Sequence, residues 1–198
     1  MIIDEQLLNI HGAQLLTLEK DEYLISTHTY PHHYYQIKSG SLKVTSDKIG
    51  LNEFIHQISG IGDPVGETFL FSESLYTINA NALSQMTVYV LGRNKFFELL
   101  EKNPETTVKL YEYTCIHINY HQTLINKIAY GDSRSRIIAV IDNLKIKEKK
   151  FRRFQYEIPY TRKQLAAMTG LRTETVVRSI KFKEKENLVK IVDGKIFY

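Results

Sequence analysis

Arginine, threonine and glutamate side chains are concentrated in one short stretch, in the order Arg172, Thr173, Glu174, Thr175 and Arg178. Arginine can donate two hydrogen bonds to the O6 and N7 atoms of guanine, and glutamate can accept one from the N4 amine of cytosine. Threonine can contact a phosphate group or the methyl group of thymine. On one helix, these side chains could read the edges of DNA bases, or they could be the solvated face of an ordinary helical hairpin.

The sequence around these residues predicts two short helices joined by a tight turn. Thr161 and Gln164 have the spacing of a capping box, in which each side chain binds the backbone N–H of the other residue. Gly170 can adopt the left-handed conformation that ends a helix. The residues that would pack the two helices together are Leu165, Ala166, Met168, Val176, Val177 and Ile180. This spacing predicts a helix-turn-helix.

Two apolar runs near the end of the sequence flank the pair Asp193 and Gly194. Such a pair predicts a β-hairpin, because a type I′ turn needs a positive φ at both central residues. A helix-turn-helix followed by a two-stranded wing is typical of a winged-helix DNA-binding domain. Lys190 and Lys195 on the wing would then lie near phosphate groups.

Positive charge is concentrated at the same end of the chain. The net charge is +4, but residues 1–144 hold 11 Lys and Arg against 16 Asp and Glu, a net charge of −5. Residues 145–198 contain 15 Lys and Arg against 6 Asp and Glu, a net charge of +9. A basic segment that coincides with a helix-turn-helix favours double-stranded DNA as the partner.

Composition limits the class of protein further. The chain has 198 residues, of which 43% are hydrophobic and 24% are charged, as is usual for a globular protein. We find no run of 18 apolar residues and no secretory signal, so we expect no membrane contact and a cytoplasmic location. Cys115 is the single cysteine, which excludes an internal disulfide and a site built from several cysteines of one chain.

The first half of the sequence predicts short strands. Residues 1–18 are consistent with a short amphipathic helix leading into strands. Residues 34–38 and 41–45 alternate around Ser39 and Gly40, which predicts a hairpin, and 53–58 and 86–91 predict further strands. Several short strands without a long helix between them suggest a small antiparallel β-roll or jelly roll.

A long helix is predicted to begin at Pro104, after a short one at 94–101. Six of its residues recur at spacings of three and four, namely Val108, Tyr111, Cys115, Ile118, Gln122 and Ile125. This seam could pack against the helix's own roll, but a long seam beside a DNA-binding domain favours a parallel homodimer. The predicted domains are therefore a roll at 1–103, a dimerisation helix at 104–130 and a winged helix-turn-helix at 131–198.

The sequence resembles the Crp/Fnr family of bacterial transcription regulators over nearly its whole length. The resemblance rests on residues 37–44, on 62–67, on the long helix and above all on 170–178. It implies an α+β fold with a cyclic-nucleotide-binding-type roll, and a homodimer on a palindromic operator. It also implies base reading by Glu174 and Arg178, with a variable position at Thr173. Candidate contacts to the DNA backbone are Arg172, Thr175, Thr161, Lys190 and Lys195. RNA polymerase is a possible further partner.

The sequence departs from that family at a possible effector pocket formed by Gly66, Glu67, Thr77, Ile78, His121 and Gln122. In members that respond to cyclic AMP, an Arg-Ser pair holding the cyclic phosphate stands where this chain has Thr77 and Ile78. The lost charge-assisted hydrogen bond is worth about 1.5–3 kcal/mol. We therefore expect no cyclic AMP binding. One cysteine cannot hold the family's four-cysteine iron–sulfur cluster, and no haem ligands can be placed, so any effector is an unknown small molecule.

Two other classes of protein stay open. The strand-rich region contains four histidines, His28, His32, His33 and His56, and clustered histidines in a barrel hold the metal in metal-dependent cupin enzymes. Here, however, the adjacent His32 and His33 would point to opposite faces of a strand, and no ligand Glu follows them. We therefore expect neither a metal site nor enzymatic activity. The winged helix could instead bind a protein partner, which the basic charge of that segment disfavours.

Overall fold

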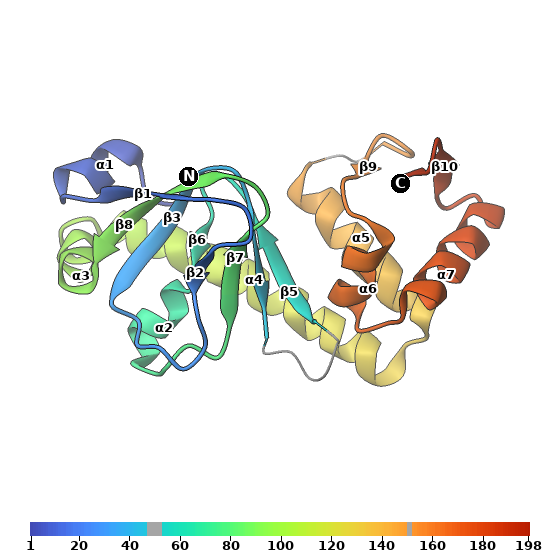
Figure 1. Ribbon diagram of the computed structural model, residues 1–198, viewed down its shortest axis with the longest axis horizontal. Coiled ribbons are helices and arrows are strands. Elements are labelled where there is room, and N and C mark those ends of the chain that lie inside the picture. Colours follow the sequence, from blue (N-terminus) through green and yellow to red (C-terminus); the bar gives the residue numbers. More distant parts are fainter. Residues whose placement is uncertain (47–52, 150–151) are drawn as a thin grey trace. The chain divides into compact units, whose positions relative to one another are not determined.

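The structure is a computed structural model that describes residues 1–46, 53–149 and 152–198 (Figure 1). The charged residues at 145–153, within the basic segment 145–198, thus lie partly outside the described residues. The chain divides into two compact units, Met1–Ile116 and His117–Tyr198. The division falls within α4 (Pro104–Tyr130), and each unit is described by itself below.

Two four-stranded antiparallel sheets make up most of the first unit. One has the strand order β1-β8-β3-β6 and the other the order β2-β7-β4-β5. The strands are β1 (Gln14–Leu18), β2 (Tyr23–Ile25), β3 (His33–Ser39), β4 (Leu42–Thr45), β5 (Ile55–Ser59), β6 (Pro64–Val65), β7 (Asn79–Ala82) and β8 (Met86–Gly92). Apolar side chains from both sheets, including Ile37, Leu42 and Val88, form a common core. The predicted β-roll is therefore confirmed.

Three helices precede α4 in this unit, namely α1 (Glu5–Ile10), α2 (Glu67–Ser72) and α3 (Arg93–Lys102). Figure 1 shows α1 and α3 beside β1 and β8. A second core joins Leu8 of α1 and Phe96 of α3 to Tyr89 of β8. Alternate residues of β8 thus face two different cores, as the period of two in a strand requires.

The predicted hairpin between residues 34–38 and 41–45 is wrong. β3 and β4 belong to different sheets, and β3 pairs with β8 and β6 instead. Gly40 between them has a φ of +80°, and a Cβ atom there would lie 2.5 Å from the Cβ atom of Met86. The glycine therefore allows a tight corner against β8, where the chain passes from one sheet to the other.

The structure has the expected short amino-terminal helix leading into a strand. α1 ends at Ile10, and Gly12 follows with a φ of +80°. Leu15, Leu16 and Leu18 lie on β1, which pairs antiparallel with β8.

The second unit combines the carboxyl half of α4 with three helices and a small sheet. The helices are α5 (Ser133–Lys147), α6 (Arg162–Thr169) and α7 (Thr173–Lys185). The strands are β9 (Glu157–Ile158), β10 (Lys190–Val192) and β11 (Lys195–Phe197), in the order β10-β11-β9. Ile141, Leu165 and Val176 of the three helices are fully buried. Among the described residues, no helix has the length and hydrophobicity needed to cross a lipid bilayer.

Candidate nucleic-acid interface

The predicted helix-turn-helix is formed by α6 and α7. The Thr161 hydroxyl accepts a hydrogen bond from the Gln164 backbone N–H at 3.2 Å, and the Thr161 backbone N–H donates to Gln164 Oε1 at 2.9 Å. Gly170 ends α6 with a φ of +66°, a left-handed conformation that costs glycine little. The capping box and the glycine turn thus set the point at which α7 begins.

One side of α7 is buried and the other is open to solvent. Val176, Ser179 and Ile180 are buried. Arg172, Glu174 and Arg178 are exposed, whereas Thr173 and Thr175 are half-buried. Since residues four apart lie on the same face of a helix, Glu174 and Arg178 project side by side. The structure therefore places the predicted base-reading residues on the open side of the second helix.

Two further lysines lie on the open side of α7 that the sequence analysis did not single out. Lys181 and Lys185 are exposed, and with Glu174 and Arg178 they continue a spacing of four, three and four residues. This periodicity was visible in the sequence and could have identified them.

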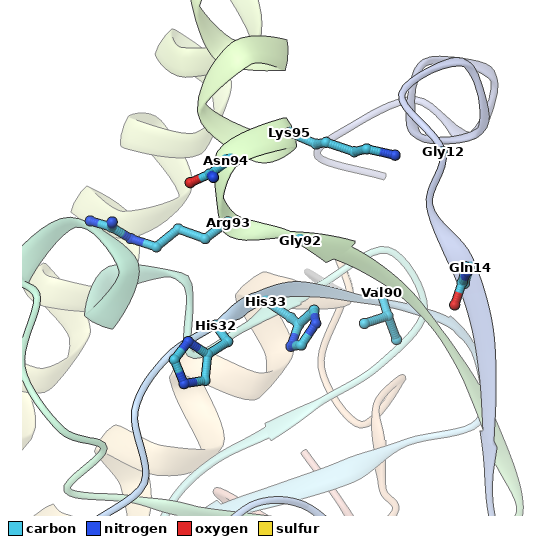
Figure 2. Close-up of a pocket in the computed structure, with 9 residues that line it drawn as sticks. All are labelled: Gly12, Gln14, His32, His33, Val90, Gly92, Arg93, Asn94 and Lys95. Atoms are coloured by element: carbon cyan, nitrogen blue, oxygen red, sulfur yellow. The ribbon is translucent and has the colours of Figure 1, made fainter.

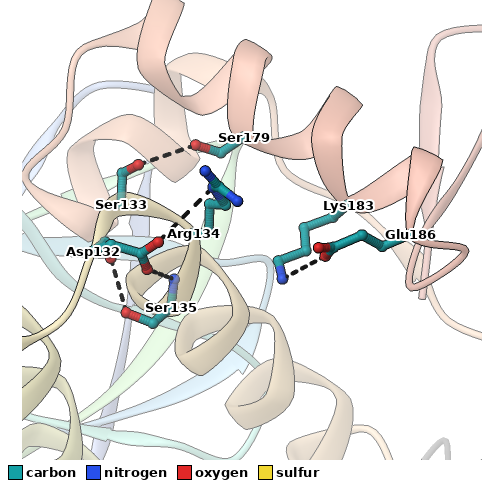
Figure 3. Close-up of polar contacts among 7 residues, drawn as sticks. All are labelled: Asp132, Ser133, Arg134, Ser135, Ser179, Lys183 and Glu186. Carbon is teal, nitrogen blue, oxygen red and sulfur yellow. Dashed lines mark hydrogen bonds and ion pairs between the residues drawn. The ribbon is translucent and has the colours of Figure 1, made fainter.

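Contacts with the first turn of α5 hold α7 in place (Figure 3). The hydroxyl oxygens of Ser133 and Ser179 are 3.3 Å apart, and the Arg134 guanidinium lies 3.8 Å from the ring centroid of Phe182 on α7. Asp132 caps α5 by accepting a hydrogen bond from the Ser135 backbone N–H at 2.8 Å. Because Ser179 and Phe182 lie on the side of α7 that faces α5, these contacts leave the opposite side free.

The predicted wing forms and is tied to the rest of the unit. Asp193 and Gly194 both have positive φ, at 48° and 77°, as expected for the turn between β10 and β11. The Ile191 backbone N–H donates to Glu184 Oε1 of α7 at 3.0 Å. Lys190 is exposed, whereas the Lys195 ammonium pairs with Glu157 of β9 at 2.7 Å. The third strand, β9, was missed because its two residues carry no periodic signal.

The six residues of the possible effector pocket lie in both units. Gly66 precedes α2 with a φ of +69°, and a Cβ atom there would lie 2.9 Å from the Tyr76 ring. Glu67 is buried, Thr77 is exposed, and Ile78 packs against the core between the two sheets. The other two, His121 and Gln122, belong to the second unit, where His121 is half-buried and Gln122 is exposed.

Burial dominates the electrostatics of Glu67. Burial raises the pKa of its carboxyl group, a hydrogen bond from the Glu67 backbone lowers it and the nearby carboxylate of Asp63 raises it, and the resulting pKa is about 7. Asp63 accepts a hydrogen bond from the Gly60 backbone N–H at 2.9 Å. The Tyr76 hydroxyl is also buried and has no hydrogen-bond partner among the described residues. The surroundings of Glu67 thus disfavour a further negative charge.

All six residues of the predicted seam lie on α4 and are open to solvent to some degree. The exposed fraction is 57% for Val108, 70% for Tyr111, 49% for Ile118 and 61% for Ile125. Gln122 is also exposed, and Cys115 is half-buried. Ile116, which the seam did not include, is also exposed, whereas Leu110 and Leu124 on other faces of α4 are buried. The exposed apolar side chains on this helix, unlike Leu110 and Leu124, thus remain largely uncovered by the described chain.

The histidines of the first unit do not form a metal centre in the part of the chain that the structure describes. No group of three or more His, Cys, Asp or Glu side chains lies close enough to hold a metal ion there. His32 and His33 are both exposed near the start of β3.

Taken together, a two-sheet roll, a long helix and a winged helix-turn-helix are the parts of a DNA-binding regulator. Residues 15–103 match the family model described as the cyclic nucleotide-binding domain. The cAMP-activated global transcriptional regulator CRP of Haemophilus influenzae is 29% identical over 158 residues, covering 79% of this chain and 70% of that protein. The protein of the same name in Pasteurella multocida is 27% identical over 158 residues, covering 79% and 75%.

Solved structures show the same fold. The c-di-GMP responsive global regulator CLP of Xanthomonas campestris superposes with a TM-score of 0.79 at 15% identity, over 98% of each chain. A CRP/FNR-family transcriptional regulator of Thermus thermophilus superposes with a TM-score of 0.69 at 18% identity, over 93% of this chain and 92% of that one. In sequence and in fold, the chain is similar to the Crp/Fnr family of DNA-binding transcription regulators.

Proposed function

We propose that this regulator binds a palindromic operator as a homodimer. The base edges in the major groove are read by Thr173, Glu174 and Arg178. The sugar-phosphate backbone of the DNA is contacted by Arg172, Thr175, Thr161, Lys190 and Lys195. Residues 1–103 act as the sensor, 104–130 as the dimerisation helix and 131–198 as the DNA-binding domain. The protein acts in the cytoplasm, where RNA polymerase is a further partner.

The open side of α7 is the observation that carries this proposal. Arg172, Glu174 and Arg178 are exposed at the amino-terminal end of the helix, and Lys181 and Lys185 extend the same side. The amino-terminal residues of a recognition helix contact base edges, and cations further along can neutralise phosphates. The pairing of Lys195 with Glu157 leaves Lys190 as the stronger candidate on the wing for a phosphate contact.

The exposed apolar residues of α4 support dimerisation. An apolar side chain such as Tyr111 or Ile125 gains free energy when it leaves water, at roughly 25 cal/mol per Å² of buried surface. A seam of heptad spacing lets two parallel α4 helices bury these side chains against each other. Since helix-turn-helix dimers bind half-sites about one helical turn apart, the operator should be palindromic.

The sensor roll is proposed not to respond to cyclic AMP, unlike the two cAMP-activated regulators named above. Cyclic AMP carries a phosphate, yet Thr77 and Ile78 offer no cation, and Asp63 adds negative charge near Glu67. The Tyr76 ring also lies beside Gly66. An effector of this roll would have to be a different small molecule, one that binds the DNA-competent form more tightly than the other form.

Selection of duplexes from a random pool tests the proposal. The purified protein is used without added ligand, and the bound DNA is sequenced. We expect an enriched palindrome with half-sites about 10 base pairs apart between centres. The Arg178→Ala variant serves as the control and should lose preference at one position of each half-site. Enrichment of a single unrepeated site would contradict the homodimer, and binding without enrichment would contradict sequence-specific reading without an effector.

A further inference from the structure

A hollow of about 590 Å³ lies at one end of the first unit, away from the residues assigned above (Figure 2). It is bounded by Gln14 of β1, His33 of β3, Gly92 at the end of β8 and Lys95 of α3, with Gly12 at its edge. Three segments that are distant in the sequence thus meet around one space. Its volume is in the range of sites that bind small molecules.

The charged side chains that line this hollow are basic. His33 and Lys95 lie toward the space, and His32 stands on its rim (Figure 2). Arg93 also borders the hollow, but its guanidinium pairs with Glu73 at 2.7 Å and points away from His33. None of the lining residues is acidic. The hollow is therefore suited to an anion, although the first 144 residues have a net charge of −5.

Lys95 is the cation best placed to bind such an anion. No ion pair within 4 Å is found for its ammonium among the described residues, although the carboxylate of Glu98, which is paired with Lys102 at 2.5 Å, also interacts with it through charge. A Cβ atom on Gly12 would lie 2.9 Å from Lys95 Nζ, so the glycine leaves room for the ammonium at this edge. An unpaired ammonium at the edge of a hollow can form charge-assisted hydrogen bonds to a ligand.

Hydrogen-bond donors other than Lys95 face the same space. The Gln14 side chain projects from β1 toward the hollow (Figure 2). Gly92 precedes α3 without a capping side chain, and a Cβ atom there would meet nothing within 4 Å. A ligand could therefore approach Gly92, although the Arg93 backbone N–H already donates to the His32 carbonyl oxygen at 2.9 Å. Cationic, amide and imidazole side chains all line the hollow. Such a set matches the several acceptor oxygens of a phosphoryl group.

We propose that this hollow binds the phosphoryl group of a small phosphate-bearing molecule. The site lies wholly within the first unit, so it does not depend on how the protein binds DNA. The probes are inorganic phosphate and glucose 6-phosphate, titrated into the full chain labelled with ¹⁵N, with chloride at matched ionic strength as the blank. We expect saturable shifts of the backbone amide signals of Asn94 and Lys95 with at least one phosphate probe and none with chloride.

Three variants make the test specific. Lys95→Gln should weaken binding about tenfold or more, because it removes a charge-assisted hydrogen bond. Lys20→Gln changes an exposed lysine of the first unit outside the hollow and should leave binding unchanged. Gly92→Met should block binding by filling the space, and the φ of −59° at this position is accessible to methionine. If that variant fails to fold, the two lysine variants still decide.

The outcomes separate the sources of the phosphoryl group. Equal affinity for both probes would mean that the phosphoryl group alone is recognised, and tighter binding of glucose 6-phosphate would favour a phosphate ester. Absence of saturable shifts, or equal weakening by Lys95→Gln and Lys20→Gln, would overturn the proposal. Tighter binding of a hexaglutamate peptide than of either probe would also overturn it, because the hollow would then be part of a surface for an acidic protein.

Discussion

The carboxyl group of Glu67 ionises inside the first unit, where water contributes little to its solvation. Its pKa of about 7 in the folded chain is above the ordinary value of 4.5, so the folded unit holds this proton more tightly than the unfolded chain does. The free energy of unfolding should therefore fall as pH rises from about 4.5 to about 7, by about 3 kcal/mol in total, and then stay level. The Glu67→Gln variant has no carboxyl group at this position, so its free energy of unfolding should not show this decrease.

Urea unfolding followed by circular dichroism at pH 5 and at pH 8 provides the measurement. We expect Glu67→Gln to unfold at a higher urea concentration than the unchanged protein at pH 8 and at a similar concentration at pH 5. Glu101→Gln is the control, since Glu101 is exposed on α3. Equal effects of the two substitutions at both pH values would show that burial of Glu67 does not govern the pH dependence.

Arg178 and Lys190 should affect DNA binding in different ways. Arg178→Ala should cost about 1–3 kcal/mol on the selected operator and relax preference at one base pair, because a base contact is lost. Lys190→Ala should weaken all duplexes alike and reduce the slope of log affinity against log salt by about one, because a phosphate contact is lost. Titrations on specific and random duplexes at several salt concentrations measure both. Equal losses on the two duplexes for Arg178→Ala would refute its role as a base reader.

Residue positions on α7 could be predicted from the sequence because a helix has a fixed period. The buried Val176 and Ile180 fix which side faces the core, and the exposure of Arg178 follows from that. The state of Glu67 could not be predicted in this way. It depends on burial by segments distant in the sequence and on the charge of Asp63, and neither leaves a periodic signal.

At the scale of elements, the capping box at the start of α6 should contribute measurably to stability. Thr161→Ala removes the hydroxyl that accepts from the Gln164 backbone N–H, and such losses typically cost about 1 kcal/mol. Amide hydrogen exchange of α6 measures the local loss. Thr161→Ser keeps the acceptor oxygen and should behave like the unchanged protein. Similar exchange rates for the alanine and serine variants would mean that the cap contributes little.

Elements with a strong local signal were predicted and those defined by distant pairing were not. Pro104 and Gly131 bound the long helix, and Asp193-Gly194 identifies the wing. β7, with the sequence Asn-Ala-Asn-Ala, has low strand propensity and exists because β2 and β4 pair with it on both sides. The hairpin error around Gly40 has the same origin, because the preferred partner of β3 is β8, about fifty residues further along.

At the scale of the whole molecule, the exposed face of α4 should decide the oligomeric state. A double variant, Ile118→Asp and Ile125→Asp, would place two carboxylates where the proposed seam buries apolar side chains, and burying unpaired charges is costly. We expect this variant to sediment as a monomer in analytical ultracentrifugation and to bind the palindrome roughly tenfold or more weakly.

A matched substitution outside α4 controls for a general effect of added charge. Ile61→Asp changes a side chain that is exposed to a similar degree in the first unit, and it should leave the protein dimeric. If the double variant also remains dimeric, the interface lies elsewhere, and α4 must be covered in some other way.

The position of β11 in the three-stranded sheet has a genetic consequence. β11 lies between β10 and β9, and the backbone of Tyr198 exchanges two hydrogen bonds with that of Tyr156. A stop codon that removes residues 195–198 would therefore delete the middle of the sheet and not its edge. The shortened copy would keep α4 and could still join intact copies. We expect such an allele to be dominant over the intact gene when the two are co-expressed with an operator-controlled reporter.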